Sequence, residues 1–499
     1  MTDTALRIKN PSVTLYAFHL CQDLSQEPEQ LRQDADQLWQ HCAKLSQPLA
    51  IPDLESLPEK ILSPPSQTAI ASRYIELLDD DDKTYTAPLQ LAGSPLTVQV
   101  YPVKIHDTYA LDLTLSCQNT TVAANQFSRL NPQGCLLASN IQASLGQTLV
   151  LYGEPVGTPE DDRTLADACV DAFFEQTYQK PELSASGHLF GSPIFAYDNG
   201  KEKPTEQCHL LVWLNRNPET LNLVEKTSLS FFNLLCCRSK ILFAYDQARW
   251  CYRQTRQLYG ELEEEVKGFK ELPRDPETRL EQLKQKLTQM PPKTFDYAGY
   301  LRDMEDHKTA IAFGAASPIA TNAHNYDTWL KKIREFSLKY DNIEFLEDFL
   351  NQRTKQFEKQ IQTNLNYLKP GQQLFDQMLG SIRGIVDIDQ AERDRDLEKA
   401  LRDKEKADQA REKSLERWIA SVGIGLGFSG ISSQTDAKPL EAILIKLNPN
   451  VFIEECPRAE LQSCLSYTFW FVLFHVLVGV GFGAITALIL GRIMHRGGK

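Results

Sequence analysis

Residues 467–491 read YTFWFVLFHVLVGVGFGAITALILG, a run of 25 residues without a charged side chain. At about 1.5 Å per residue, a helix of this length covers a ~30 Å hydrocarbon core. A second uncharged run, WIASVGIGLGFSGISSQT, lies upstream at residues 418–435. It has only eighteen residues, and its four glycines lower both its hydrophobicity and its helix propensity. The two runs predict either a single tail anchor or a hairpin of two membrane spans.

The charges on either side of the two runs favour the hairpin. The tail at 492–499 and the segment just before residue 418 are both basic, whereas residues 436–465 carry five acidic and three basic residues. Basic residues prefer the cytosolic side of a membrane. The N-terminus shows no secretory signal. We therefore predict a multi-pass protein of the inner or an internal membrane with both termini in the cytosol, and a re-entrant first segment is the alternative.

Small and polar residues in the two runs are the candidates for lining a pore or packing the helices. A GxxxG spacing occurs in each run and permits close approach of two helices, although glycines that face lipid would show the same pattern. A histidine in the middle of a span is expected to face a partner helix or a pore. The candidates are Gly423, Gly425, Gly427, Ser429, Ser432, Ser433, His475, Gly479, Gly481 and Gly483.

Two of the eleven cysteines lie between the runs. Cys456 and Cys464 in CPRAELQSC would face an oxidising compartment, where a disulfide between them competes with two free thiols. The other nine cysteines mostly adjoin apolar residues, and we expect them to be buried small hydrophobic residues.

A long helical region precedes the first uncharged run. The sequence Asn217-Pro218-Glu219 is typical of a helix start, and a long helix is expected to follow it to about Glu271. Arg238 and Lys240 within its apolar stretch indicate a core helix and not a membrane span. Asp275-Pro276-Glu277 predicts a further helix, and Pro370-Gly371 is expected to break a later one. Residues 384–417 are rich in helix formers and predict either a stalk or a solvated charged helix.

Residues 1–217 show both strand and helix patterns. In YALDLTLSC, at residues 109–117, larger apolar residues alternate with smaller or polar ones, which is typical of a half-buried strand. Residues 14–21, 96–100, 148–152 and 208–214 also resemble strands, and residues 164–178 resemble a helix. The strands and helices do not alternate strictly. This region is therefore predicted to be an α/β or α+β sheet domain whose strand order stays open.

The resulting fold class is α+β, with an α/β N-terminal sheet domain followed by an all-α layer, a long stalk helix and a C-terminal transmembrane helical hairpin. The predicted segments are a sheet domain at 1–217, a helical domain at 218–383, a stalk at 384–417, a first span at 418–435, a loop at 436–465, a second span at 466–491 and a basic tail at 492–499.

Composition and missing motifs limit the chemistry. A net charge of −13 argues against general nucleic-acid binding, which needs basic side chains to neutralise phosphates. The sequence has no phosphate-binding glycine loop, nucleophile elbow or zinc-type spacing, so we expect no enzyme activity and no cofactor. The exception would be a divalent cation held by hard carboxylate oxygens, and the weak candidates are Glu76, Asp79, Asp80, Asp81 and Asp82. The alternative for these residues is a solvated acidic turn.

The order of segments resembles the CorA-type magnesium channel superfamily, in which a cytosolic domain leads through a long stalk helix to two C-terminal spans. The resemblance is one of architecture and covers residues 218–499. That family ends its first span with Gly-Met-Asn, whereas residues 427–433 here read GFSGISS, so no selectivity residue is carried over. The loop between the spans is also longer than is typical of that family.

This resemblance implies a homo-oligomeric membrane protein with an ion pathway gated by its large cytosolic domain. The partners it implies are the lipid bilayer, further copies of the chain, and a small nucleotide or an ion as ligand. Two other functions stay open: a membrane-anchored sensor or scaffold without conduction, and a membrane effector of prokaryotic defence gated by a nucleotide signal.

Overall fold

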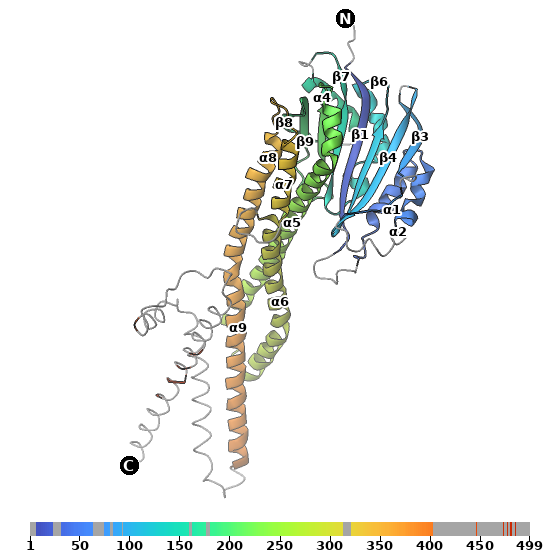
Figure 1. Cartoon of the computed structure of the whole chain (residues 1–499). Helices are drawn as coiled ribbons and strands as arrows, with labels where there is room; N and C mark the ends of the chain where they lie inside the picture. The colour runs from blue at the N-terminus through green and yellow to red at the C-terminus, as the bar shows by residue number, and fades with distance from the viewer. Residues whose placement is uncertain are drawn as a thin grey trace. The chain divides into compact units, whose positions relative to one another are not determined.

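The computed structural model describes residues 6–22, 31–62, 74–79, 83–91, 93–158, 162–175, 180–312 and 321–402, together with six isolated positions between 446 and 485. Its contacts divide the chain into two compact units, residues 1–386 and residues 387–499. The first unit contains a large sheet and a group of long helices (Figure 1).

A mixed sheet of ten strands forms the N-terminal half of the first unit. Its order is β2-β4-β5-β1-β7-β10-β9-β8, while β3 pairs with β4 and β6 pairs with β1. All the pairs are antiparallel except β7 with β10. The strands are β1 (Arg7–Leu20), β2 (Tyr74–Glu76), β3 (Thr84–Leu91), β4 (Ser94–Ile105), β5 (Thr108–Ser116), β6 (Thr121–Ala123), β7 (Gly146–Val156), β8 (Glu182–Leu189), β9 (Ser192–Asp198) and β10 (His209–Leu214).

Short helices cover one face of this sheet. They are α1 (Gln37–Ala43), α2 (Leu57–Leu62), α3 (Ala138–Ile141) and α4 (Asp162–Phe173), with several 3-10 turns between them. Alternate residues of a strand point to the same face. Val13, Leu15 and Ala17 of β1 therefore share one core with Leu38 and Trp39 of α1, and all five are completely buried.

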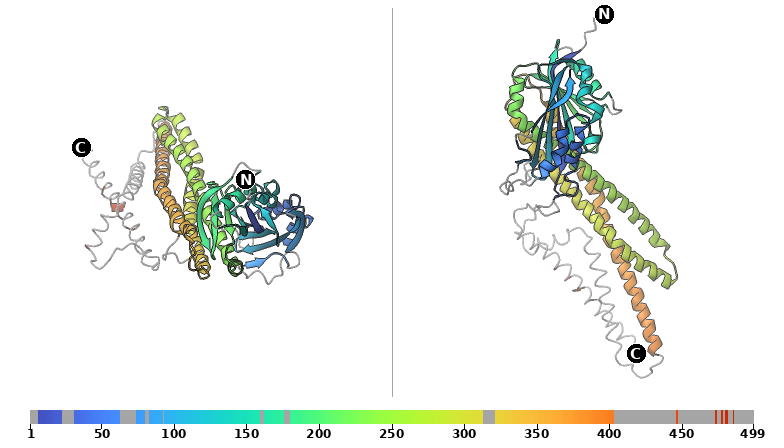
Figure 2. Two further views of the ribbon diagram at one scale, coloured as in Figure 1. Left: turned by 90° about the horizontal axis from the view of Figure 1, so that it is seen from above. Right: turned by 90° about the vertical axis from the view of Figure 1, so that its right-hand side faces the viewer.

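Long helices cover part of the other face. They are α5 (Thr220–Gly268), α6 (Pro276–Ile311), α7 (Asn322–Arg334), α8 (Glu344–Asp348) and α9 (Lys355–Arg402). Phe232 of α5 packs against the rings of Tyr16 and Phe18 of β1, at centroid distances of 5.7 and 5.4 Å. Beyond the sheet, α5, α6 and the first part of α9 run side by side (Figures 1 and 2). The rings of Tyr245 and Phe357 stack at 4.0 Å between α5 and α9.

The predicted helix starts are confirmed. Asn217 Oδ1 accepts a hydrogen bond from the Glu219 amide at 3.0 Å just before α5 begins. At the start of α6, Asp275 Oδ2 accepts from the Thr278 amide at 2.9 Å. The Asp275 contact satisfies an amide that has no partner inside the first turn of α6. Asn217 is not the N-cap of α5: the N-cap is Glu219, and no side chain among the described residues caps that helix.

The assignment of Arg238 and Lys240 to a core helix is also confirmed. Both lie in α5, where Arg238 pairs with Asp198 of β9 at 3.5 Å and Lys240 bonds Asp107 in the β4–β5 turn. A buried cation needs such a partner because its desolvation is costly.

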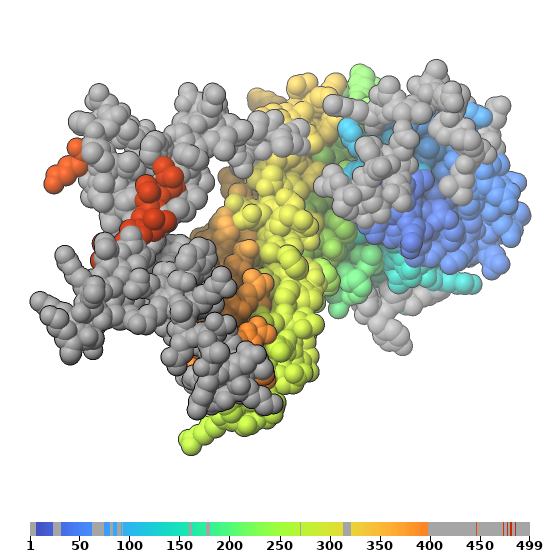
Figure 3. Space-filling view, turned by 90° about the horizontal axis from the view of Figure 1, so that it is seen from below, coloured from blue at the N-terminus to red at the C-terminus, as the bar shows by residue number. Residues whose placement is uncertain are grey.

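The expected break at Pro370-Gly371 is wrong. Helix α9 continues through both residues to Arg402. Pro370 removes one backbone hydrogen bond, but Leu368 and Phe375 on either side are buried against the other long helices. The free energy gained by burying these two side chains exceeds the cost of the missing hydrogen bond. In the space-filling view of Figure 3, the yellow-green residues of α5 and α6 lie against the orange residues of α9.

The predictions of a membrane location and of ion transport need correction. Among the helices that the structure describes, none combines the length and the apolar character needed to cross a bilayer. For this part of the chain the predicted multi-pass location, the ion pathway and the gated CorA-like channel function are therefore wrong, as are the two membrane-bound alternatives. The two uncharged runs on which those predictions rested lie outside the described residues, apart from single positions.

The coarser prediction of the fold is confirmed: an N-terminal mixed sheet is followed by long helices. The structure adds strands that the sequence patterns did not reveal, namely β2, β3, β6, β8 and β9.

Candidate functional site

A pocket of about 170 Å³ opens between the sheet and the first turns of α5. At ~30 Å³ for each water, this is the volume of about six waters, and an engineered cavity of similar size holds one benzene ring. The lining consists of Ser12, Thr14 and Tyr16 of β1, Val150 and Tyr152 of β7, Trp213 of β10, and Leu221, Val224, Thr227, Ser228 and Phe231 of α5.

Strand register brings the sheet residues of this pocket together. Ser12 lies opposite Tyr152, and Tyr152 lies opposite Trp213 in the next strand. Thr14, two residues after Ser12, lies opposite Val150. Because alternate residues share a face of the sheet, all five side chains lie on the face towards α5.

Aromatic rings surround the inner end of the pocket. Trp213 is 3% exposed, and its ring lies 5.9 Å from Phe231, 5.8 Å from Phe190 and 6.5 Å from Tyr152. The Nε1–H of Trp213 is buried and has no hydrogen-bond partner within the described residues. A buried donor without a partner costs about 1–3 kcal/mol.

A chain of hydroxyl groups leads from the pocket to a carboxyl group. Thr14 Oγ1 lies 2.8 Å from Thr114 Oγ1 on β5, its register partner. Thr114 Oγ1 donates to Asp112 Oδ1 at 3.2 Å. Asp112 itself does not line the pocket, but the two hydroxyls connect it to the pocket wall.

Asp112 is unusual among the acidic residues because it lies in a strand, between two tyrosines. Its register partners are Tyr16 on one side and Tyr101 on the other. Burial raises the pKa of Asp112 to about 7, and the hydrogen bond from Thr114 opposes this increase. Burial, and then the charge of Asp112, also raise the pKa of Tyr16. A carboxyl group that titrates near neutrality is a common feature of functional sites.

Glu76, one of the metal candidates, lies in β2 and contacts Tyr101 and Lys83. Lys83 Nζ is 2.7 Å from Glu76 Oε2 and 5.0 Å from the centre of the Tyr101 ring. Tyr101 donates its hydroxyl proton to the same Glu76 carboxylate. Asp79 is exposed, and residues 80–82 lie outside the described residues. In the part of the chain that the structure describes, no group of three metal-ligating side chains comes together. The divalent cation stays a prediction.

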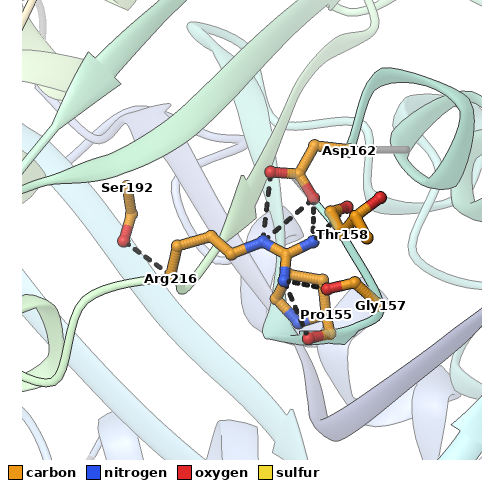
Figure 4. Close-up of polar contacts among 6 residues, drawn as sticks. All are labelled: Pro155, Gly157, Thr158, Asp162, Ser192 and Arg216. Carbon is orange, nitrogen blue, oxygen red and sulfur yellow. Dashed lines mark hydrogen bonds and ion pairs between the residues drawn. The ribbon is translucent and has the colours of Figure 1, made fainter. Parts of the chain in front are cut away.

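Arg216, between β10 and α5, joins the chain after β7 to the start of α4 (Figure 4). Its side chain donates to Asp162 at 3.1 Å, to the Gly157 carbonyl at 2.7 Å and to the Thr158 carbonyl at 2.9 Å. Its backbone amide donates to Ser192 Oγ at 2.9 Å. Since the guanidinium donors have these acceptors, we assign Arg216 a structural role.

The ion pair of Arg238 and Asp198 also belongs to the interior. His209, the partner of Asp198 in the sheet register, is buried, and its Nδ1 lies 2.9 Å from Thr148 Oγ1. Burial, followed by the charges of Arg238 and Arg353, lowers the pKa of His209 well below its ordinary value. A neutral, bonded histidine in this position supports packing between the sheet and the helices.

The residues predicted from the sequence to form a pore lie almost entirely outside the described residues. Gly481 is the exception, and it is helical. The two loop cysteines, Cys456 and Cys464, also lie outside. The expectation for the other cysteines is confirmed, because all nine are free and buried: Cys21, Cys42, Cys117, Cys135, Cys169, Cys208, Cys236, Cys237 and Cys251.

The pocket residues were missed by sequence reasoning, although one signal was present. Asp112, Thr114 and Ser116 alternate with leucines in β5, and Ser12, Thr14 and Tyr16 alternate with Val13, Leu15 and Ala17 in β1. If β1 and β5 are neighbours, their polar residues form one polar region on a face of the sheet. The sequence does not show that these two strands pair.

Comparisons with known proteins identify no relative: no family model, no curated protein and no solved structure matches the chain. The resemblance to the CorA-type superfamily therefore stays a prediction based on the order of segments alone.

Proposed function

We propose that the protein binds a small molecule, of the size of a single ring, in the pocket between the sheet and α5. One observation carries the proposal: a pocket of about 170 Å³ with an aromatic and hydroxyl lining. Binding sites for small molecules typically combine apolar walls with a few polar groups that fix the orientation of the ligand.

The role we infer is binding and not catalysis. The polar groups of the pocket wall are hydroxyls and an indole, and the hydroxyls of Thr227 and Ser228 already donate to carbonyls of α5, at 2.7 and 2.9 Å. Such groups orient a ligand, whereas nucleophilic or acid–base catalysis needs a base within hydrogen-bond reach of the reacting atom.

Ligand-observed NMR with the full chain tests this function. We expect saturation transfer to single-ring probes such as toluene and phenol. Val224→Trp places a large side chain in the helical wall of the pocket and should abolish the signal. Ile388→Trp, at an exposed position of α9, is the matched control and should preserve it. Absence of transfer from every ring probe to the unmodified chain would refute the proposal.

Two further expectations remain predictions. Formation of a homo-oligomer can be tested by light scattering of the purified chain, and a nucleotide or ion ligand by calorimetric titration. The helical hairpin predicted for residues 418–435 and 466–491 lies outside the described residues, and binding at the sheet does not depend on it.

A further inference from the structure

The hydroxyl chain behind the pocket has a direction, and this direction determines which ligand the pocket selects. Above its pKa of about 7, Asp112 is ionised and can only accept, so Thr114 Oγ1 donates its single proton to it. The bond between Thr114 and Thr14, at 2.8 Å, then needs its proton from Thr14. A threonine hydroxyl has one proton and two acceptor lone pairs. With its proton used towards Thr114, Thr14 can only accept at the pocket wall.

We propose that the pocket selects a single-ring ligand with a hydrogen-bond donor at the Thr14 end. Phenols and ring heterocycles with an N–H group are chemical classes that supply such a donor in this volume. This inference rests on the proposed function, because it names the ligand class of the same pocket.

The Thr14 end of the pocket requires a donor from the ligand. Thr14 offers lone pairs as long as Asp112 accepts from Thr114. A purely apolar ring, or a ring that carries only acceptors, would leave these lone pairs unpaired.

Thr227 provides a matched control for Thr14. Both threonines line the pocket. The Thr227 hydroxyl, however, donates to the Leu223 carbonyl of its own helix at 2.7 Å, and it has no connection to Asp112 in this structure. Valine has nearly the same volume as threonine but lacks the hydroxyl. Only Thr14→Val therefore removes the end of the hydroxyl chain that leads to Asp112.

The experiment compares three probes of nearly equal size by NMR titration of the full chain at pH 8, where Asp112 is ionised: phenol, anisole and toluene. Phenol carries a donor, anisole has an oxygen acceptor without a donor, and toluene has neither. We expect phenol to bind tightest, by about fivefold to tenfold, which corresponds to one neutral hydrogen bond. Thr14→Val should abolish this preference, whereas Thr227→Val should preserve it.

Asp112→Asn provides a second measurement. An amide offers a donor as well as an acceptor to Thr114, so the chain loses its fixed direction. We expect the preference for phenol over anisole to fall in this variant. If toluene, anisole and phenol bind the unmodified chain equally well, the ligand class is wrong while the binding function stands. If none of them binds, the proposed function itself is wrong.

Discussion

Asp112→Asn should make the stability of the sheet domain less dependent on pH. The pKa of this carboxyl is raised from 3.8 to about 7 in the folded chain, because the group is buried between strands. The folded state therefore keeps a proton that the unfolded chain releases above its ordinary pKa. Stability from this group is greatest below pH ~4 and is lost as the pH rises towards 7.

The magnitude follows from the size of the shift. Each pKa unit corresponds to about 1.4 kcal/mol, so a shift of roughly three units gives an upper limit of about 4 kcal/mol above pH 7. Asp112 is half-buried, and water around it reduces this value. We expect Asp112→Asn to stabilise the chain by about 2–4 kcal/mol at pH 8 and to have little effect at pH 4.

Urea unfolding followed by tryptophan fluorescence provides the assay, since Trp39 and Trp213 lie in the two cores of the sheet. The difference in midpoint between Asp112→Asn and the unmodified chain should grow from pH 4 to pH 8. Asp79→Asn, at an exposed position, controls for the loss of one negative charge. A difference that stays constant from pH 4 to pH 8 would show that Asp112 does not hold its proton in the folded chain.

Three further predictions concern packing. Gly371→Ala should lower the stability by about 2 kcal/mol in thermal unfolding, because its new Cβ would overlap the Tyr297 hydroxyl and this exceeds the ~1 kcal/mol gain in helix propensity. Gly384→Ala meets open space and should be neutral or stabilising. In a chain whose two loop cysteines are replaced by serine, the nine buried cysteines should not react with a thiol reagent until the chain unfolds, and rapid reaction of the native chain would contradict their burial. Arg216→Lys should cost about 1–3 kcal/mol and accelerate amide hydrogen exchange in α4, since an ammonium cannot reproduce the forked contacts with Asp162 and two carbonyls. Unchanged exchange there would argue against the structural role of Arg216.

Local patterns in the sequence predicted the elements of the fold whose causes are themselves local. The period-2 pattern of β5, the position where α5 begins and the cap of α6 depend on neighbouring residues, and these predictions agree with the structure. The break at Pro370 failed because the continuity of α9 depends on burial against helices distant in the sequence. Tyr297 of α6 donates to the Leu368 carbonyl at 2.6 Å, a contact that no local sequence pattern predicts.

The candidate site depended even more on distant contacts. Thr14 and Trp213 are almost two hundred positions apart, and they meet only because β7 lies between β1 and β10 in the sheet. The polar alternation of β1 and β5 could be read from the sequence, but the pairing of these two strands could not. Asp112 was therefore visible as a polar residue of a strand and not as the end of a hydroxyl chain.

Because α5 is long, a movement of this helix at the pocket would be transmitted beyond the sheet. The helix begins at the pocket wall, is held on the sheet near Leu235, and continues as one element to Gly268. At about 1.5 Å per residue, the segment before Leu235 measures ~20 Å and the segment after it ~50 Å. If α5 pivots rigidly at its contact with the sheet, a displacement of ~1 Å at Leu221 becomes more than ~2 Å at the far end. A rigid rotation of α5 would therefore move the end of the helix at Gly268 farther than the end at the pocket.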